Sequence, residues 1–352
     1  MELNDLRRKI DEVDFKILKL FNERMELAIQ TKKLKPGIED PLREKEILQK
    51  VARLRTELLS PNFLNAVYVH VIEESRRRQG ENRLLVGFQG EHGAFSEAAA
   101  RKYLPDQVYI PFAEFEEIFL SVEQGILDFG IVPVENSLGG AVTQVNDLLI
   151  KTPLSVAGEV NIQIRHCLLT LHGSDHKEIK AVYSHPQALA QCKSFILRNK
   201  LEGRPYYDTA GAAKMLAIER PRAAAAIASE LCAGLYHLEV IKAGIEDNPR
   251  NLTRFLILGK EPAKEGNKCS LVFSAPHKVG ALFHVLKIFT EAGINLTRIE
   301  SVPIVGKDIH YAFFTDFQGS DREPVVKETL ERVKQQSLTY KFLGCYTEEK
   351  IQ

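Results

Sequence analysis

Apolar side chains recur at helical spacing through residues 1–80. One long stripe advances by alternating steps of three and four residues, which predicts the seam of a long helix that packs against other helices. A second helix is predicted to begin at Asp40-Pro41, because Asp can cap a helix and Pro suits its first turn. A third helix follows Pro61. The stripe of the first helix consists of Leu3, Leu6, Ile10, Val13, Ile17, Leu20, Leu27, Thr31 and Leu34.

Arg24 occupies one position of this apolar stripe. A charge in such a place costs on the order of several kcal/mol unless another group pairs with it. Arg7 and Lys35 lie one residue past the stripe, so the helix directs these cations along one side. The other two predicted helices carry polar residues at or beside their own apolar positions, namely Arg43, Glu44, Ser75 and Gln79.

This polar set has two interpretations. In the first, the helices form a dimerisation hairpin in which Glu44 neutralises Arg24 as a structural device. In the second, the set forms a functional site. A nucleic-acid-binding helix is disfavoured, because Lys and Arg are interleaved with Asp and Glu and no helix face is purely basic.

Residues 84–260 show short apolar runs that alternate with helical segments, the pattern of an α/β domain. A loop from Gly90 to Gly93 is either a structural turn or an anion-binding loop before a helix. Strands are predicted at 84–88, 129–134, 181–184, 240–245 and 251–257. Helices are predicted from Phe95, at 142–149, 188–198, from 208–211 with Thr209 as a cap, and at 221–235 with the alanine run 223–226 in a helix core.

Polar clusters stand at the ends of these predicted strands, where α/β sheets place their ligands. Each cluster also has a structural explanation. Asn136-Ser137 suits a plain turn, His185 suits a strand terminator before Pro186, and Thr253-Arg254 suits a polar pair on an edge strand.

The C-terminal part follows a polar segment at 261–267 that is a plausible linker. Its pattern is β-α-β-β-α-β, which predicts a ferredoxin-like sandwich of the α+β class. Strands are predicted at 269–274, 294–304, 309–317 and 338–346, and helices at 279–291 and 323–335.

Composition narrows the function classes. The chain has 352 residues, enough for two or three domains, and its 47 acidic and 47 basic residues balance. It starts without an apolar signal segment, and no apolar run reaches membrane-spanning length. The five cysteines lack metal-type or redox spacing. We therefore expect a cytoplasmic multidomain protein with no metal, no cofactor, and no nucleic-acid or membrane partner.

Over residues 1–80, the order of these polar residues resembles the all-helical chorismate mutases. The resemblance implies an intertwined dimer of three-helix chains, in which Arg7 reaches into the partner's site. The reaction is a pericyclic shift from chorismate to prephenate, so it needs no nucleophile, proton transfer or metal. The catalyst holds a folded dianion and stabilises negative charge on the breaking ether oxygen.

The resemblance also implies roles for single residues. Arg7 and Arg24 would clamp carboxylates, and Lys35 and Gln79 would donate to the ether oxygen. Glu44 would accept from the ring hydroxyl. The remaining members are Arg43 and Ser75, which would complete the pocket, and Asp40, which is a helix cap first and a ligand contact second.

Residues 83–260 resemble prephenate dehydratases through the stretches VPVENSLGGAV, VYSHPQALAQC, DTAGAA, AAIAS, LYHLEV and NLTRF. The implied fold has two α/β lobes, like a periplasmic solute-binding protein, at about 84–157 plus 244–260 and about 158–243. The implied reaction removes water and carbon dioxide from prephenate to give phenylpyruvate. Thr253 would assist departure of the ring hydroxyl. The implied substrate contacts are Asn136, Ser137, His185, Thr209, Arg254 and Phe255.

Residues 268–350 are similar to the amino-acid-binding regulatory domain called ACT. In dehydratases of this type that domain binds phenylalanine between paired subunits. The chain departs from the usual pattern at Val279, where Pro is common, and at Val302, where Arg is common. The implied effector contacts are Gly280, Ala281, Leu282, Glu300 and Ser301.

Together these resemblances imply a bifunctional chorismate mutase–prephenate dehydratase of phenylalanine synthesis, inhibited by phenylalanine and assembled as a homodimer or a larger even oligomer. Three alternatives stay open. The dehydratase could act on arogenate, the transaminated relative of prephenate. One of the two activities could be dead. The chain could instead be a two-lobed solute sensor, although Thr253-Arg254 and the complete helical set count against that class.

Overall fold

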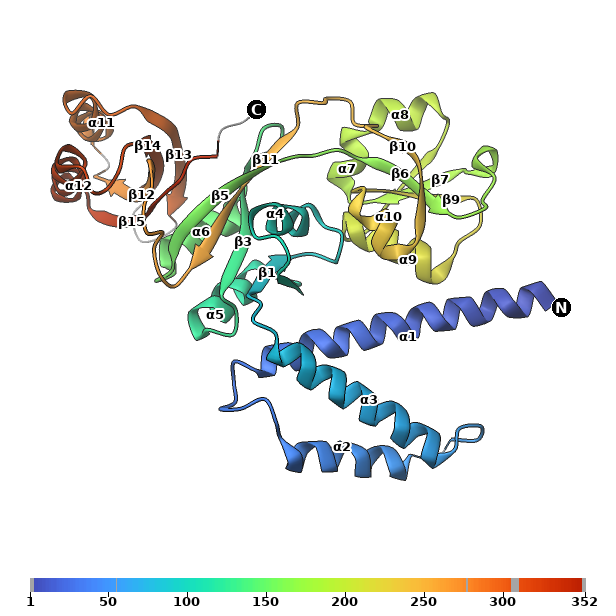
Figure 1. The fold of residues 1–352 in the computed structure, drawn as a ribbon. Helices are drawn as coiled ribbons and strands as arrows, with labels where there is room; N and C mark the ends of the chain where they lie inside the picture. Colours follow the sequence, from blue (N-terminus) through green and yellow to red (C-terminus); the bar gives the residue numbers. More distant parts are fainter. Residues whose placement is uncertain (1–2, 55, 277, 305–309, 350–352) are drawn as a thin grey trace. The chain divides into compact units, whose positions relative to one another are not determined.

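A computed structural model describes residues 3–54, 56–276, 278–304 and 310–349. The chain divides into two compact units, residues 1–85 and 86–352. The N-terminal unit consists of helices α1 (Leu3–Thr31), α2 (Pro41–Arg53) and α3 (Pro61–Gly80), as the periodicity predicts (Figure 1). Asp40 caps α2 by accepting from the Arg43 amide at 3.0 Å, and Ser60 caps α3 in the same way. Because α1 ends at Thr31, Leu34 and Lys35 lie outside this helix, although the prediction placed them along it.

The apolar stripe of α1 is largely exposed within this one chain. Ile10 and Leu20 keep 58% and 63% of their side-chain surface accessible. Packing between the helices buries Ile29 and Val51 together with Val71 of α3. Ile29 is not a member of the stripe, and the stripe residues Leu27 and Leu34 are exposed, so the predicted packing of the stripe is not observed within this chain. The stripe is an exposed apolar surface along α1.

The first lobe of the C-terminal unit is built on a mixed sheet of order β2-β1-β3-β11-β5, with β4 paired to β3. Its strands are β1 (Leu85–Gln89), β2 (Val108–Phe112), β3 (Phe129–Asn136), β4 (Gly140–Ala141), β5 (Ser155–Gln163) and β11 (Leu252–Gly259). Its helices are α4 (Phe95–Tyr103), α5 (Phe115–Gln124) and α6 (Thr143–Lys151). The chain leaves this lobe after β5 and returns at β11 (Figure 1). Because β5 pairs with β11, this lobe extends to residue 163 and not to the predicted 157.

The second lobe is built on a sheet of order β10-β6-β9-β7-β8. Its strands are β6 (Cys167–Leu171), β7 (Ala181–Ser184), β8 (Glu202–Pro205), β9 (Ala224–Ala228) and β10 (Leu238–Ala243). Its helices are the short 3-10 helix η1 (His176–Glu178), α7 (Pro186–Gln191), α8 (Lys193–Arg198), α9 (Thr209–Glu219) and α10 (Leu231–Tyr236). Two lobes of this kind confirm the predicted α/β architecture.

The predicted helix 221–235 is wrong in its first half, because the alanine run forms strand β9. Every residue of β9 is buried. A strand buried on both faces lacks the alternation that marks a half-exposed strand, so periodicity cannot separate it from a buried helix. The predicted helix 188–198 is also divided, into α7 and α8.

The C-terminal domain has the predicted β-α-β-β-α-β order, with its sheet in the order β13-β14-β12-β15. Its buried core lies between this sheet and the two helices. The predicted strand start at Ile309 and the domain end at residue 350 lie outside the described residues. The elements are β12 (Lys268–Ala275), α11 (Ala281–Glu291), β13 (Leu296–Ile304), β14 (His310–Gln318), α12 (Pro324–Gln336) and β15 (Thr339–Tyr346).

This domain packs directly against the first lobe. Gly344 of β15 has φ +150°, and a Cβ added there would lie 2.5 Å from the Val156 carbonyl oxygen of β5. A side chain at that position would push the two strands apart. Residues 261–267 therefore connect two parts of one compact unit, not two separate bodies.

Candidate active sites

Arg24 and Ser75 of the helical set lie together. Arg24 Nη1 donates to Ser75 Oγ at 2.8 Å, and Ser75 Oγ donates to the Val71 carbonyl at 2.7 Å. Ser75 is buried, and burial lowers the pKa of the Arg24 guanidinium from its usual value. Arg7, in contrast, lies on the exposed part of α1, where it is open to a second chain.

Glu44 does not neutralise Arg24. Its carboxylate pairs instead with Arg76 of α3, at 3.7 Å between Oε1 and Nε. Arg43 pairs with Glu46 on the exposed face of α2, at 3.0 Å. Within the chain, the Arg24 cation therefore has a hydroxyl and not the Glu44 carboxylate as its described hydrogen-bond partner.

Gln79 and Lys35 make contacts within the chain. Gln79 Nε2 donates to the Ala28 carbonyl at 2.7 Å and to Thr31 Oγ1 at 3.3 Å, while its Oε1 is buried without a hydrogen-bond partner. Lys35 Nζ donates to the Ile38 carbonyl at 2.5 Å. The Gln79 amide donors are thus used by α1, and donation to a ligand would require this amide to turn.

In the C-terminal unit, Asn136 and Thr253 form the centre of the predicted dehydratase set. They are direct partners in the antiparallel register of β3 and β11. Asn136 Nδ2 donates to Thr253 Oγ1 at 2.8 Å and to Asn251 Oδ1 at 2.7 Å, and Asn136 Oδ1 accepts from the Gly139 amide. Because Thr253 Oγ1 accepts here, its own proton is left for another acceptor.

Ser137 ties the same two strands together one residue further along. Its Oγ donates to the Arg250 carbonyl at 3.1 Å and accepts from the Leu252 amide at 2.9 Å. These bonds fix the loop before β11 against the end of β3. The structure therefore brings Asn136, Ser137 and Thr253 together at the ends of β3 and β11.

His185 and Gln187 come from the second lobe. His185 is the N-cap of α7 and accepts from the Gln187 amide at 3.3 Å. The Gln187 side chain reaches the loop after β3: a Cβ added at Gly139 would lie 2.8 Å from Gln187 Nε2. Sequence reasoning missed Gln187, although it stands inside the VYSHPQALAQC stretch.

Thr209 is the first residue of α9 and does not cap it. Asp208 is the N-cap and accepts from the Gly211 amide at 2.6 Å. This frees the Thr209 hydroxyl from the predicted capping role.

The loop from Gly90 to Gly93 contains an acidic side chain, Glu91. Glu91 accepts from Tyr207 at 2.7 Å and from Lys214 at 2.8 Å, both in the second lobe. Burial raises the pKa of Glu91, but the bonds from Lys214 and Tyr207 outweigh burial and hold it below the usual value. The loop therefore links the two lobes, and a carboxylate there disfavours its use as an anion-binding loop.

Arg254 and Phe255 differ from the predicted substrate contacts. The Arg254 side chain is only 6% exposed and bonds to Glu159 at 2.7 Å, Asp316 at 2.5 Å and Tyr346 at 2.9 Å. Burial lowers the pKa of its guanidinium, but the neighbouring charges outweigh burial and hold it above the usual value. Phe255 is 2% exposed and belongs to the core. Both side chains are occupied by protein contacts.

The first part of the predicted effector set lies at the start of α11. Gly280 is its N-cap, with φ +82°, a conformation that favours glycine. Ala281 is buried and Leu282 packs against the domain core, while Val279 is fully exposed. The helix start therefore presents backbone and not a capping side chain.

The second part of the effector set lies on β13. Glu300 accepts from Arg298 Nη2, and Ser301 is exposed. Val302 is 5% exposed, so this chain has a buried apolar side chain where the family pattern has a cation.

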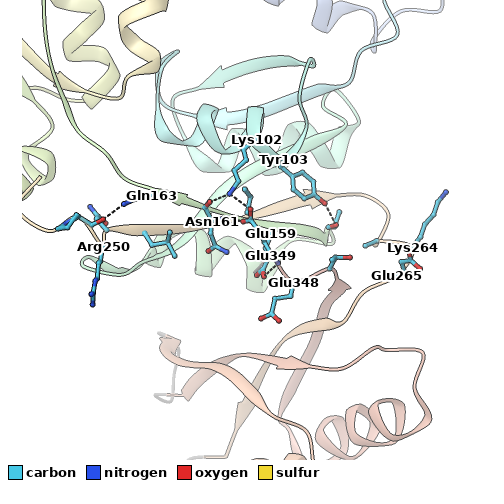
Figure 2. A pocket seen from close by; sticks show the side chains of 17 residues that line it. Lys102, Tyr103, Glu159, Asn161, Gln163, Arg250, Lys264, Glu265, Glu348 and Glu349 are labelled. Atoms are coloured by element: carbon cyan, nitrogen blue, oxygen red, sulfur yellow. Dashed lines mark hydrogen bonds and ion pairs between the residues drawn. The ribbon is translucent and has the colours of Figure 1, made fainter. Parts of the chain in front are cut away.

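Two cavities flank β5 and β11. The larger, of about 1190 Å³, is lined by residues along β5, by the end of α4 and by the segment after β15 (Figure 2). Its Lys102 donates to the Asn161 carbonyl at 2.9 Å and pairs with Glu349 at 2.6 Å. The smaller, of about 740 Å³, includes the predicted residues Asn136, Ser137, Arg254 and Glu300.

Within the described ranges, no helix is long and apolar enough to cross a membrane. No group of three or more His, Cys, Asp or Glu side chains could hold a metal ion among the residues that the structure describes.

Comparison with known proteins assigns each part of the chain. Family profiles match chorismate mutase type II at residues 6–80, prephenate dehydratase at 86–263 and the ACT domain at 270–335. The bifunctional chorismate mutase/prephenate dehydratase of Aquifex aeolicus is 35% identical over 100% of this chain and 99% of its own length. The Arabidopsis thaliana arogenate dehydratase/prephenate dehydratase 2 is 39% identical over 75% of this chain and 73% of its own. Among solved structures, the Arthrobacter aurescens prephenate dehydratase in complex with L-Phe has a TM-score of 0.69 and 30% identity, over 75% of this chain and 90% of that chain.

Proposed function

This chain belongs to the bifunctional chorismate mutase/prephenate dehydratase family, and we propose on that premise which residues carry out each of the two reactions. The enzyme rearranges chorismate to prephenate, then decarboxylates and dehydrates prephenate to phenylpyruvate. The observation that carries this conclusion is the match to a bifunctional relative over 100% of this chain, together with family matches to both catalytic domains. Purified protein is given chorismate, and the formation of prephenate and of phenylpyruvate is measured separately to test it.

For the mutase reaction, the cations of α1 supply the binding energy. Arg24 holds a substrate carboxylate from a half-buried position, where a charge-assisted bond is stronger than in water. Ser75 fixes the guanidinium that makes this contact. Lys35 stabilises the charge that develops on the ether oxygen, and Glu44 accepts from the ring hydroxyl. Gln79 joins them once its amide has turned.

For the dehydratase reaction, Thr253 donates to the departing ring hydroxyl. Its proton is available because Asn136 Nδ2 already donates to Oγ1. A threonine is a poor acid, so the assistance is a hydrogen bond to the developing hydroxide and not a full proton transfer. Asn136 and Ser137 hold the strand ends, and Gln187, Thr209 and His185 close the site from the second lobe.

Prephenate is favoured over arogenate as the dehydratase substrate. The chain carries its own mutase domain, whose product is prephenate, and its match to the bifunctional relative includes that domain. The plant relative whose name includes arogenate dehydratase matches 75% of this chain. A direct comparison of kcat/KM for the two compounds separates them.

We place the enzyme in the cytoplasm. Its five cysteines are all free and buried, which suits a reducing compartment.

A homodimer, or a larger even assembly, completes the mutase site. The exposed stripe of α1 is an apolar surface along a helix that a second copy would bury. Arg7 lies on that exposed helix and therefore can enter the partner's site.

Mixed dimers test this arrangement. Arg7→Ala and Arg24→Ala are each expected to be nearly inactive as mutases, because every site lacks one cation. Refolding the two variants together should restore activity, since one site of each mixed dimer then receives both intact residues. Chorismate consumption is measured before and after mixing. An absence of complementation would show that each site is built from a single chain.

Phenylalanine is expected to inhibit the dehydratase, and tyrosine to inhibit it less. The effector binds at Gly280, Ala281 and Leu282 and at Glu300 and Ser301, and backbone amides at the start of α11 can meet its carboxylate. Titration of each amino acid against prephenate turnover measures this. If millimolar phenylalanine neither binds nor inhibits, the C-terminal domain serves assembly instead, and Val302→Arg is the variant to examine.

A further inference from the structure

The strand pair that carries Thr253 has two distinct faces. In the register of β11 and β3, Thr253 lies opposite Asn136, and Arg254 lies opposite Glu135. Side chains alternate along a strand, so the first pair points to one face of the sheet and the second pair to the other. Thr253 and Asn136 form the proposed catalytic face. The opposite face is in contact with the regulatory domain, residues 268–349.

Asp316 of the regulatory domain holds Arg254. Its Oδ2 accepts from Arg254 Nη1 at 2.5 Å, and its Oδ1 accepts from Ser270. Tyr346 accepts from Arg254 Nη2 at 2.9 Å. Burial raises the pKa of Asp316, but the charges of Arg254 and Arg298 outweigh burial and keep the carboxylate ionised. Arg254, the residue after Thr253, is thus held by a buried carboxylate of the regulatory domain.

Arg298 of the regulatory domain forms an ion pair with Glu135, although its Nε makes no hydrogen bond to that carboxylate. Arg298 Nε lies 2.9 Å from Glu135 Oε2, and Arg254 Nη1 lies 3.5 Å from Glu135 Oε1. The Arg298 side chain is 9% exposed. Its Nη2 also bonds to Glu300, a member of the proposed effector set. Charges therefore alternate from Glu300 through Arg298, Glu135 and Arg254 to Asp316.

We propose that Arg298 and Asp316 are positioning residues for the dehydratase reaction, which hold Asn136 and Thr253 in place through their neighbours Glu135 and Arg254. The proposal rests on the proposed function of Thr253. It requires no contact between the regulatory side chains and substrate. A displacement of about 1 Å at reacting groups can cost on the order of a hundredfold in rate, so fixing this strand pair matters for turnover.

The same chain of charges gives the effector a route to the site. The ammonium group of an amino acid at Glu300 would compete with Arg298 for that carboxylate. The ion pair between Arg298 and Glu135 would then change, and the effector would favour one arrangement of β3 over another. Inhibition by phenylalanine would therefore depend on Arg298.

Steady-state kinetics of Arg298→Gln, Glu135→Gln and the double variant test the proposal. Each single variant should lower kcat for prephenate by about tenfold or more, with KM within about twofold of the parent. The double variant should be no slower than the slower single variant, because each single substitution already removes the same ion pair between Arg298 and Glu135. Arg298→Lys keeps the cation and should recover part of kcat. Phenylalanine should inhibit Arg298→Gln less strongly than the parent.

Arg332→Gln is the matched control. It breaks an ion pair to Glu291 at 2.5 Å that lies between α12 and α11 of the same domain, and kcat should stay unchanged. Parental kcat and phenylalanine response in Arg298→Gln and Glu135→Gln would overturn the positioning role. Thr253→Val separates the proposed role of Thr253 from the positioning role of Arg298. If Thr253→Val is inactive while Arg298→Gln is fully active, only the positioning role fails. If it keeps full turnover, the proposed role of Thr253 fails and the positioning role fails with it.

Discussion

Arg24→Ala should lower chorismate turnover on the order of a hundredfold or more, while the same protein still converts added prephenate at close to the parental rate. The side chain is half-buried and bonds to Ser75, so its charge is aimed into the helical unit and not into solvent. The dehydratase residues belong to the other compact unit, and none of their described hydrogen bonds involves Arg24. Both rates are measured on one preparation.

Arg77→Ala provides the control for charge removal on a helix of the same unit. Arg77 pairs with Glu74 and Glu81 on the exposed face of α3, at 2.6 Å and 3.0 Å, and exposed pairs of this kind contribute little to stability. The Arg77→Ala variant should convert chorismate at the parental rate. Mutase activity of Arg24→Ala within about threefold of the parent, in a dimer that is still intact, would remove Arg24 from the catalytic set.

Thr253→Val should lower prephenate turnover on the order of a hundredfold and leave the mutase rate unchanged. Valine has nearly the same shape but lacks the hydroxyl that donates to the departing group. Asn136 loses one acceptor but keeps Asn251 Oδ1 at 2.7 Å, so the strand ends remain connected. Prephenate consumption and phenylpyruvate formation are followed together.

Thr329→Val is the matched control for loss of a buried hydroxyl. Thr329 is 2% exposed in α12 and donates to the Val325 carbonyl at 2.8 Å, away from β3 and β11. Its prephenate turnover should stay near the parental value. An unchanged rate in Thr253→Val would move the role to Ser137, Thr209 or His185.

Much of the architecture could be predicted because local chemistry determines it. Asp40 caps α2 and Pro41 is its first residue, as predicted from their side chains. In the C-terminal domain, the predicted order of strands and helices agrees with the structure. The alanine run of β9 could not be assigned, because a strand buried on both faces has no period.

The arrangement of the candidate site residues could be predicted less fully, and for a different reason. Thr253 and Arg254 share a motif, but neighbours in a strand point to opposite faces, so one lies beside Asn136 and the other meets Asp316. Because side chains alternate along a strand, the sequence already indicated that Thr253 and Arg254 lie on opposite faces of the sheet. The approach of Gln187 to Gly139 depends on how the lobes come together, and no local pattern encodes that distance.

The central claim is that one chain performs both reactions in sequence. Purified protein is given chorismate alone, and prephenate and phenylpyruvate are quantified separately over time. The account predicts that chorismate disappears, prephenate forms, and phenylpyruvate follows without any other enzyme. Chorismate that stays unchanged, or prephenate that accumulates and is never converted even when supplied directly, would contradict it.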